Sequence, residues 1–195
     1  MIGKSLIDCI AGQWSPGIGD PNATGWLTVL AYLLCFGLAV AVWRRLGGQR
    51  GRAFWGLIMV LMLFLAVNKQ LDLQSALTAW GRCLARAQGW YAQRRFVQEA
   101  FIFGLLLLAA AGLIAGLVGL RGRLRRHGVA LAGLIVLAAF VMVRAVSFHH
   151  VDRLIGLNQF GVSGNYLFEN AGLVLIALNA VAILRRPQSP APQWS

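Results

Sequence analysis

Five long apolar runs constrain the fold of this 195-residue chain more than any other feature. Each is close to the ~20 residues that an α-helix needs to cross the hydrocarbon of a bilayer. Lipid offers no hydrogen-bond partners, so a spanning segment has to pair its backbone within itself, as a helix does. The sequence therefore predicts an all-α membrane protein, a bundle of five transmembrane helices. The predicted spans are residues 25–43, 53–69, 100–120, 128–147 and 165–184.

The composition argues against a soluble fold. The chain is 58% hydrophobic and 12% charged, whereas soluble domains are about 25% charged. The net charge of +12 could indicate a nucleic-acid partner. Nucleic-acid-binding domains gather their basic residues on one soluble face, but here these residues lie mostly between apolar runs. We therefore expect a lipid bilayer around the protein and no nucleic acid.

The charged residues predict the orientation of the spans. Segments 44–52, 121–127 and 185–186 hold ten of the 18 Lys and Arg residues and none of the six acids. The positive-inside rule places such segments in the cytoplasm. We therefore expect a periplasmic N-terminus, a cytoplasmic C-terminus and, most simply, a bacterial inner (plasma) membrane.

The flanking segments are expected to differ from the five-span domain, residues 25–186. Residues 1–24 form the periplasmic N-terminal segment, where Ile2, Leu6, Ile7 and Ile10 could line one face of a short interfacial helix. This segment lacks the long apolar core of a cleaved signal peptide. Residues 187–195 are rich in proline and predict a disordered cytoplasmic tail.

The outer connector, residues 70–98, is expected to contain an amphipathic interfacial helix over residues 73–91. Its apolar residues recur at helical spacing. They are Leu73, Leu77, Trp80, Leu84, Ala87 and Tyr91. This helix is either a lid or lipid-facing platform on the outer leaflet, or a plain connector that covers the spans.

Small residues mark one side of the third span. Gly112, Gly116 and Gly119 let helix backbones approach closely in lipid. Such a face serves either a dimer contact or internal packing, and we expect internal packing in a five-span protein.

Two opposite charges lie inside the outer membrane boundary. The last run is clearly apolar only over residues 171–184, so a full span has to include Glu169 and Asn170. Arg144 lies about one helical turn inside the end of the fourth run. An unpaired charge at this depth costs several kcal/mol. We therefore predict that Arg144 and Glu169 pair, either as a structural contact or as part of a site.

We predict that the outer polar residues converge on one cavity, open to the outside and roofed by the 73–91 helix. Lys69 and Asp72 are three apart, which puts them on one face of a continuous helix. The expected binding residues are Asn68, Lys69, Arg144, Ser147, Asp152, Glu169 and Asn170. The alternative is a few isolated pairs with no shared cavity.

Acid/base or metal chemistry in this cavity would fall to a second set of residues. The catalytic candidates are Asp72, Glu99, His149 and His150, and the candidate Zn ligands are His149, His150 and Asp72. No HxxxH, HExxH or paired-cysteine motif is present, so the sequence requires no cofactor. His127 lies among arginines on the cytoplasmic side and cannot join the cavity.

Two of the three cysteines lie on the outer side. Cys9 and Cys83 could form a disulfide there, because an oxidising periplasm permits one. Two free thiols are the other state, and this is the state that we expect. Cys35 lies inside the first span and is expected to pack there.

One stretch resembles known proteins. It reads Asn-Lys-Gln-Leu-Asp-Leu-Gln over residues 68–74, followed by Gly89-Trp90-Tyr91 and Arg94-Arg95. This pattern is similar to one in small bacterial multi-pass inner-membrane proteins of unassigned function. The resemblance implies the same membrane and carries over no active site.

Three classes of function are consistent with these features. The first is a non-enzymatic accessory or assembly protein, which binds a membrane-protein partner. The second is an intramembrane hydrolase or transferase, with or without Zn, which acts on a lipid or lipid-linked substrate at the outer leaflet. The third is a small transporter, which usually shows an inverted repeat or broken spans; neither is found here.

Overall fold

The computed structural model describes residues 2–15, 22–49, 51–146 and 164–187 of the chain. These residues form seven α-helices and one short 3₁₀ helix, with no strand among them. The elements are α1 (Ile2–Gln13), α2 (Ala23–Arg45), α3 (Arg52–Leu71), α4 (Leu73–Ala87), η1 (Tyr91–Gln93), α5 (Arg94–Gly119), α6 (Leu124–Val146) and α8 (Gly164–Arg185). Five helices, α2, α3, α5, α6 and α8, are long and apolar enough to cross a membrane. The predicted all-α, five-span architecture is confirmed.

The boundaries of the spanning helices follow from the residues at their ends. Asn22 precedes α2, and its Oδ1 accepts a hydrogen bond from the Gly25 backbone N–H at 2.8 Å. This side chain satisfies one of the backbone donors that a helix start leaves unpaired. Arg44 and Arg45 end α2, and Arg185 ends α8. A cation is favourable there because it faces the negative end of the helix dipole.

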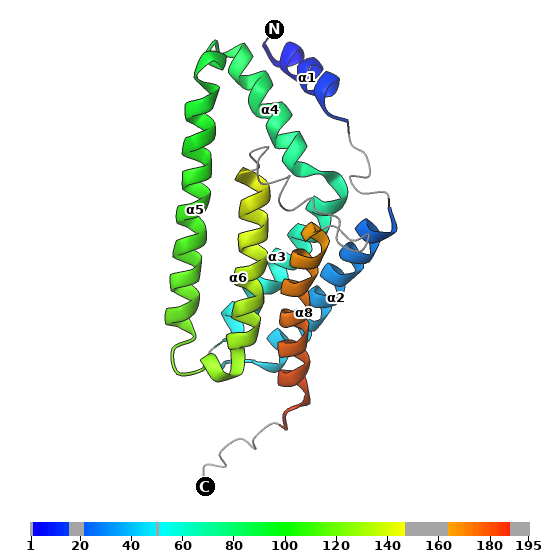
Figure 1. Cartoon of the computed structure of the whole chain (residues 1–195), viewed down its shortest axis with the longest axis vertical. Coiled ribbons are helices and arrows are strands. Elements are labelled where there is room, and N and C mark those ends of the chain that lie inside the picture. The colour runs from blue at the N-terminus through cyan, green and yellow to red at the C-terminus, as the bar shows by residue number, and fades with distance from the viewer. Residues whose placement is uncertain (1, 16–21, 50, 147–163, 188–195) are drawn as a thin grey trace.

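Helices α2, α3, α6 and α8 form the main bundle. Helix α2 packs against both α3 and α8, and α6 packs along α8 (Figure 1). The core side chains Tyr32, Trp55, Ile58, Met62 and Ile176 are almost completely buried. These residues come from α2, α3 and α8, so the core ties together segments that are far apart in sequence.

Helices α6 and α8 approach closely at a pair of glycines. A Cβ atom on Gly133 would lie 2.7 Å from the carbonyl oxygen of Gly172, and one on Gly172 would lie 2.9 Å from that of Gly133. Any other residue would push the two backbones apart. Small residues permit such contacts between helices in lipid.

Helix α5 stands apart from the main bundle. Figure 1 shows it beside α6, on the side away from α2 and α8. None of the residues in its apolar spanning window is buried, whereas 28–39% are buried in the other four spans. A Cβ atom on Gly116 would lie 3.4 Å from a methyl of Leu131, but one on Gly104, Gly112 or Gly119 would meet nothing within 4 Å. The expectation of internal packing is therefore wrong for Gly112 and Gly119.

The outer connector is an amphipathic helix, as predicted, but it is shorter than residues 73–91. Helix α4 ends at Ala87, and Gly89 follows with a φ of 76° that favours glycine. Figure 1 shows α4 running from the end of α3 towards the start of α5, with α1 beside it. A disulfide between Cys9 and Cys83 joins α1 to α4, so the expectation of two free thiols is wrong.

Candidate functional site

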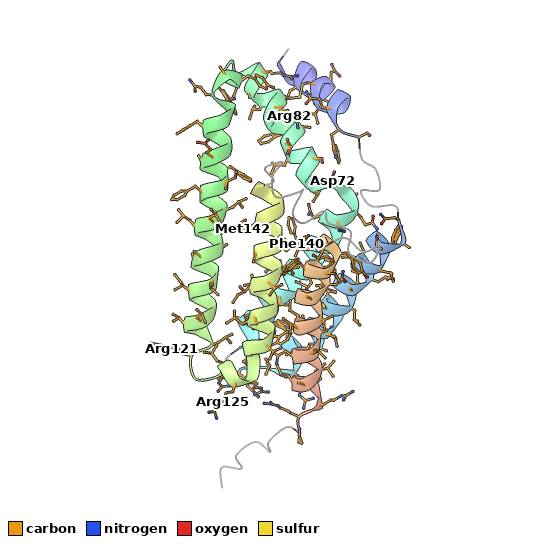
Figure 2. All side chains as sticks on the ribbon, in the orientation of Figure 1. Asp72, Arg82, Arg121, Arg125, Phe140 and Met142 are labelled. Atoms are coloured by element: carbon orange, nitrogen blue, oxygen red, sulfur yellow. A yellow bond between two sulfur atoms is a disulfide. The ribbon has the colours of Figure 1, made fainter. Side chains whose placement is uncertain are left out.

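The described charges divide between two ends of the protein. We call the end with Arg44, Arg45, the segment 121–127 and Arg185 the arginine end, and the opposite end the acid end. Figure 2 shows Arg121 and Arg125 at the arginine end and Asp72 towards the other. All described acids lie in elements of the acid end, and these acids are Asp8, Asp72, Glu99 and Glu169.

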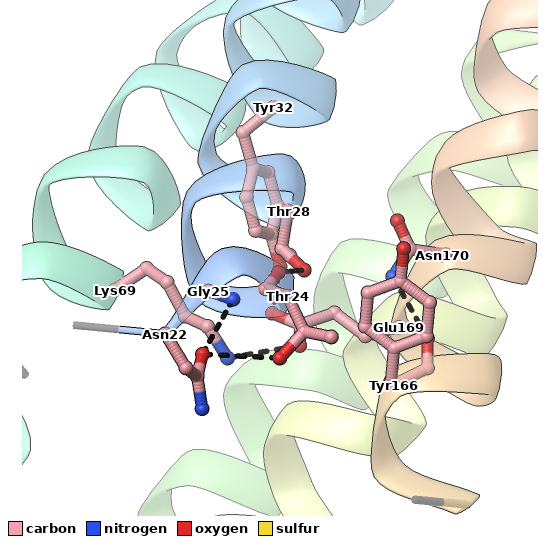
Figure 3. A network of polar contacts seen from close by, with 9 residues as sticks. All are labelled: Asn22, Thr24, Gly25, Thr28, Tyr32, Lys69, Tyr166, Glu169 and Asn170. Atoms are coloured by element: carbon pink, nitrogen blue, oxygen red, sulfur yellow. Dashed lines mark hydrogen bonds and ion pairs between the residues drawn. The ribbon is translucent and has the colours of Figure 1, made fainter. Parts of the chain in front are cut away.

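A buried carboxylate forms the centre of the acid end. Glu169, in the second turn of α8, is only 4% exposed. The Tyr32 hydroxyl donates a hydrogen bond to Glu169 Oε1 at 2.9 Å, and Lys69 Nζ lies 3.2 Å from Glu169 Oε2. We call these three residues the Glu169 cluster (Figure 3). Both carboxylate oxygens are engaged, which offsets the cost of removing the charge from water.

Three helices bring the Glu169 cluster together. Tyr32 lies in α2, Lys69 in the last turn of α3 and Glu169 in α8. Because the two neighbouring spans run in opposite directions, the end of α3 and the start of α8 reach the same level. Lys69 and Glu169 were predicted from the sequence, but Tyr32 was not, since a single hydroxyl inside an apolar run looks like an ordinary span residue.

Neighbouring polar side chains satisfy themselves within their own helices. Asn170 Nδ2 donates to the backbone oxygen of Tyr166 at 2.8 Å, and the buried Thr28 donates through Oγ1 to the backbone oxygen of Thr24 at 2.9 Å. Figure 3 shows both contacts beside the Glu169 cluster. Asn170 was predicted as a binding residue, and it lies next to the cluster through its position in the sequence.

Asp72 does not share a helical face with Lys69, contrary to the spacing argument. Its backbone is left-handed, with a φ of 45°, and it lies between the end of α3 and the start of α4. Its carboxylate accepts a hydrogen bond from the Ser75 hydroxyl. Spacing along a helix has no meaning across such a break. Asn68 stays within α3 and is half-buried.

The remaining predicted residues fall in three places. Glu99 is an exposed residue of α5, the helix that stands apart from the main bundle. Arg144 belongs to the last turn of α6, but its side chain lies outside the described residues, so its pairing with Glu169 stays a prediction. Ser147, His149, His150 and Asp152 also lie outside them. The shared outer cavity likewise stays a prediction.

The metal site stays a prediction too. In the ranges that the structure describes, no three His, Cys, Asp or Glu side chains gather in a way that could hold a metal ion. His149 and His150, the proposed Zn ligands, are not among these residues. His127 is buried at the arginine end, away from the Glu169 cluster, where the sequence placed it.

Comparisons with protein families, with curated proteins and with solved structures find no match for the chain. The chemistry of the site therefore has to be inferred from its own residues.

Proposed function

We propose that the protein is a non-enzymatic accessory or assembly protein of a bacterial inner membrane, and that α5 binds its membrane-protein partner. One observation carries this proposal: α5 is the single span among the described helices whose apolar window has no buried residue. A helix in lipid does not need a protein contact. The residues that α5 exposes, however, are those that favour one.

Small residues line the exposed surface of α5. Ala111, Gly112 and Ala115 are all exposed, and a Cβ atom on Gly112 would have open space around it. In lipid, small residues are enriched where helix backbones meet, because association depends on close van der Waals contact. A face that bears them without a partner inside the chain is suited to the helix of another molecule.

The Glu169 cluster supports the same proposal in a different way. Tyr32, Lys69 and Glu169 satisfy one another between α2, α3 and α8, so the cluster holds the main bundle together. A rigid bundle that carries one loosely packed helix is the arrangement we expect of a protein that docks a partner.

The disulfide supports the proposed orientation. Cys9 and Cys83 lie at the acid end, opposite the arginine end. Disulfides persist in oxidising compartments such as the periplasm, and arginine-rich loops stay in the cytoplasm. Both rules give the same orientation, with the N-terminus periplasmic and the C-terminus cytoplasmic.

Photo-crosslinking in native membranes tests the docking helix. A photoreactive residue at Gly112 of α5 should give a protein adduct, and one at the exposed Leu178 of α8 should give only lipid adducts. An adduct of twice the 21.2 kDa mass identifies a second copy, and any other mass identifies a different protein. Lipid adducts alone at Gly112 would refute the proposal.

A matched pair of substitutions controls for damage to the fold. Ala115 of α5 and Ala171 of α8 are both exposed alanines on spanning helices. Ala115→Phe should abolish the Gly112 adduct, because the large ring keeps the partner helix away. Ala171→Phe should leave the adduct unchanged. Equal effects of the two substitutions would argue against a docking face on α5.

One observation favours the enzyme alternative, a hydrolase or transferase acting on a lipid or lipid-linked substrate at the outer leaflet. Glu169 lies between a phenol and an ammonium group, and these are groups that transfer protons in enzymes. Metal analysis of protein purified with its lipid tests the Zn-dependent form. Near one Zn per chain would support the enzyme, and protein without Zn would count against that form.

A further inference from the structure

Three helix termini meet at the arginine end, and hydrogen bonds fix them there. Arg45 Nη1 donates to the backbone oxygen of Leu184 at 2.7 Å, and Arg45 Nη2 donates to that of Arg186. Asn179 Nδ2 donates to the backbone oxygen of Arg126 at 3.0 Å. The end of α2 and the start of α6 are therefore both held against the end of α8.

This arrangement brings cations together without an anion. Arg45, Arg123 and Arg186 lie close enough for their charges to act on Arg126. Among the described residues no acid lies near these arginines, because Asp8, Asp72, Glu99 and Glu169 all belong to the acid end. Like charges at short range repel one another. An anion among them would remove this repulsion.

Hydrogen-bond donors are also left over at this end. Arg126 Nε and His127 Nε2 are buried, and neither has a hydrogen-bond partner among the described residues. The Trp55 indole N–H donates to His127 Nδ1 at 3.1 Å, so the neutral imidazole carries its proton on Nε2. Buried donors are almost always paired in folded proteins, so an acceptor bound at this end would satisfy both donors.

The turn before α3 keeps these donors close to one another. A Cβ atom on Gly51 would lie 2.8 Å from His127 Nε2, so only glycine fits there. Gln49 of the same turn accepts a hydrogen bond from Arg126 Nη1 at 3.4 Å. His127 and Arg126 therefore face the same short turn, which lies against the start of α6.

We propose that Arg126 and Arg186 bind the phosphate of an anionic phospholipid at the arginine end, beside Arg45, whose guanidinium holds the end of α8. A guanidinium group presents a planar fork of donors that matches phosphate oxygens. These arginines also lie at the ends of apolar spans, at the level of lipid head groups. Basic pockets between spanning helices on the cytoplasmic side are known to hold anionic head groups.

The position of Trp43 also supports a place at the level of the lipid head groups. The Arg52 guanidinium lies 4.1 Å from the centre of the Trp43 ring, and Trp43 is half-buried near the end of α2. Tryptophan is enriched where hydrocarbon meets head groups. The arginine end therefore lies at the boundary where a lipid phosphate is available, which is why we favour a lipid over a soluble phosphate.

Native mass spectrometry of the full chain in neutral detergent tests this site. The protein is titrated with phosphatidylglycerol and, separately, with phosphatidylcholine. The site variant is Arg126→Gln with Arg186→Gln, and the control variant is Arg121→Gln with Arg125→Gln. Both remove two positive charges from the same end, and Arg121 and Arg125 are exposed there (Figure 2). Phosphatidylglycerol should bind the site variant about tenfold more weakly than the control variant, because charge-assisted hydrogen bonds are lost.

Each other outcome would overturn the proposal. Equal weakening in both variants would show a general attraction of lipid to a basic surface. Equal binding of phosphatidylcholine would show that the head-group charge is not recognised. Inorganic phosphate that binds the protein in phosphatidylcholine nanodiscs and excludes phosphatidylglycerol would identify a soluble ligand instead.

The folded state of the site variant can be checked on the same samples. The buried thiol of Cys35 reacts with a maleimide dye only when the bundle opens, so the dye reports the melting temperature. If the site variant does not fold, Arg126→Lys with Arg186→Lys keeps both charges but removes the planar fork. This variant should then lose the preference for phosphatidylglycerol. A retained preference would refute the site, whether or not α5 docks a partner.

Discussion

A charged residue buried inside an apolar bundle needs a hydrogen-bond or ion-pair partner to offset the cost of its burial. Glu169 is an example, because its two oxygens meet Tyr32 from α2 and Lys69 from α3. Removing one partner of a buried pair leaves a charge without compensation, which is worse than having no pair at all. Lys69 is 14% exposed, so water moderates the penalty on its side.

We expect the Glu169 cluster to contribute to stability as a unit. Lys69→Met and Glu169→Gln should each lower the free energy of unfolding by about 2–3 kcal/mol. The double substitution should cost about 1–2 kcal/mol less than the sum, because the first change already removes the interaction between the two residues. Melting in detergent, followed by the reactivity of Cys35, measures all three. Strict additivity would show that the two residues do not act as a pair.

An exposed acid provides the control. Asp8→Asn in α1 should change stability by no more than about 0.5 kcal/mol. Adding Arg144→Gln to the same cycle tests the predicted pair between Arg144 and Glu169, which the described side chains do not decide.

The sequence could predict part of this site. Span length forced Glu169 inside the membrane boundary, and the same argument required a partner at that depth. Whether Lys69 of α3 or Arg144 of α6 pairs with Glu169 depends on how each helix is rotated about its axis. Residue spacing along one helix does not determine this rotation. Tyr32 could not be found, because its hydroxyl gains a role only when α8 packs against α2.

At the scale of whole elements, the surroundings of the glycines differ between the packed helices α6 and α8 and the unpacked helix α5. Gly133 and Gly172 lie where α6 and α8 touch, and a side chain on either would meet backbone. A Cβ atom on Gly112 of α5 would meet nothing within 4 Å. One residue type therefore serves two purposes in this chain, and only the structure distinguishes them.

This difference predicts opposite effects of the same substitution. Gly133→Ala should destabilise the protein by about 1–3 kcal/mol, because the added methyl overpacks the contact between α6 and α8. Gly112→Ala should be neutral or stabilise the protein slightly, since alanine favours a helix over glycine. Melting temperatures of the two variants in one detergent measure the contrast. Equal losses would mean that α5 is packed as tightly as α6.

Fold class could be read from the sequence, whereas helix arrangement could not. Run length and apolarity are sufficient to locate five spans, because lipid requires both. In water an apolar stripe marks the buried face of a helix, but in a membrane the lipid-facing side is apolar as well. The span in α5 has a mean hydropathy of 2.6, above the 1.6–2.1 of the other four spans, so its isolated position is reflected in its hydropathy.

At the scale of the whole molecule, charge and disulfide chemistry act on opposite ends. The arginine end carries Arg44, Arg45 and the segment 121–127, and the acid end carries the bond between Cys9 and Cys83. A membrane that is reducing on one side and oxidising on the other accommodates both in one orientation only.

Labelling of intact cells should report this orientation. A cysteine in place of the exposed Gln88 should react with a membrane-impermeant maleimide from outside. One in place of the exposed Gln49 should react only after permeabilisation. Background should be low, since Cys9 and Cys83 are bonded to each other and Cys35 is buried. The reverse pattern would show that the arginine end faces outwards.

The members of the Glu169 cluster are synthesised at different times. Tyr32 precedes Glu169 by 137 residues, and Lys69 precedes it by 100. Ribosomes add roughly 5–20 residues per second, so Lys69 waits in the membrane for about 5–20 s before its partner is made. During that interval α2 and α3 form a hairpin that lacks the Glu169 carboxylate. The Glu169 cluster can therefore form only after the start of α8 has been made.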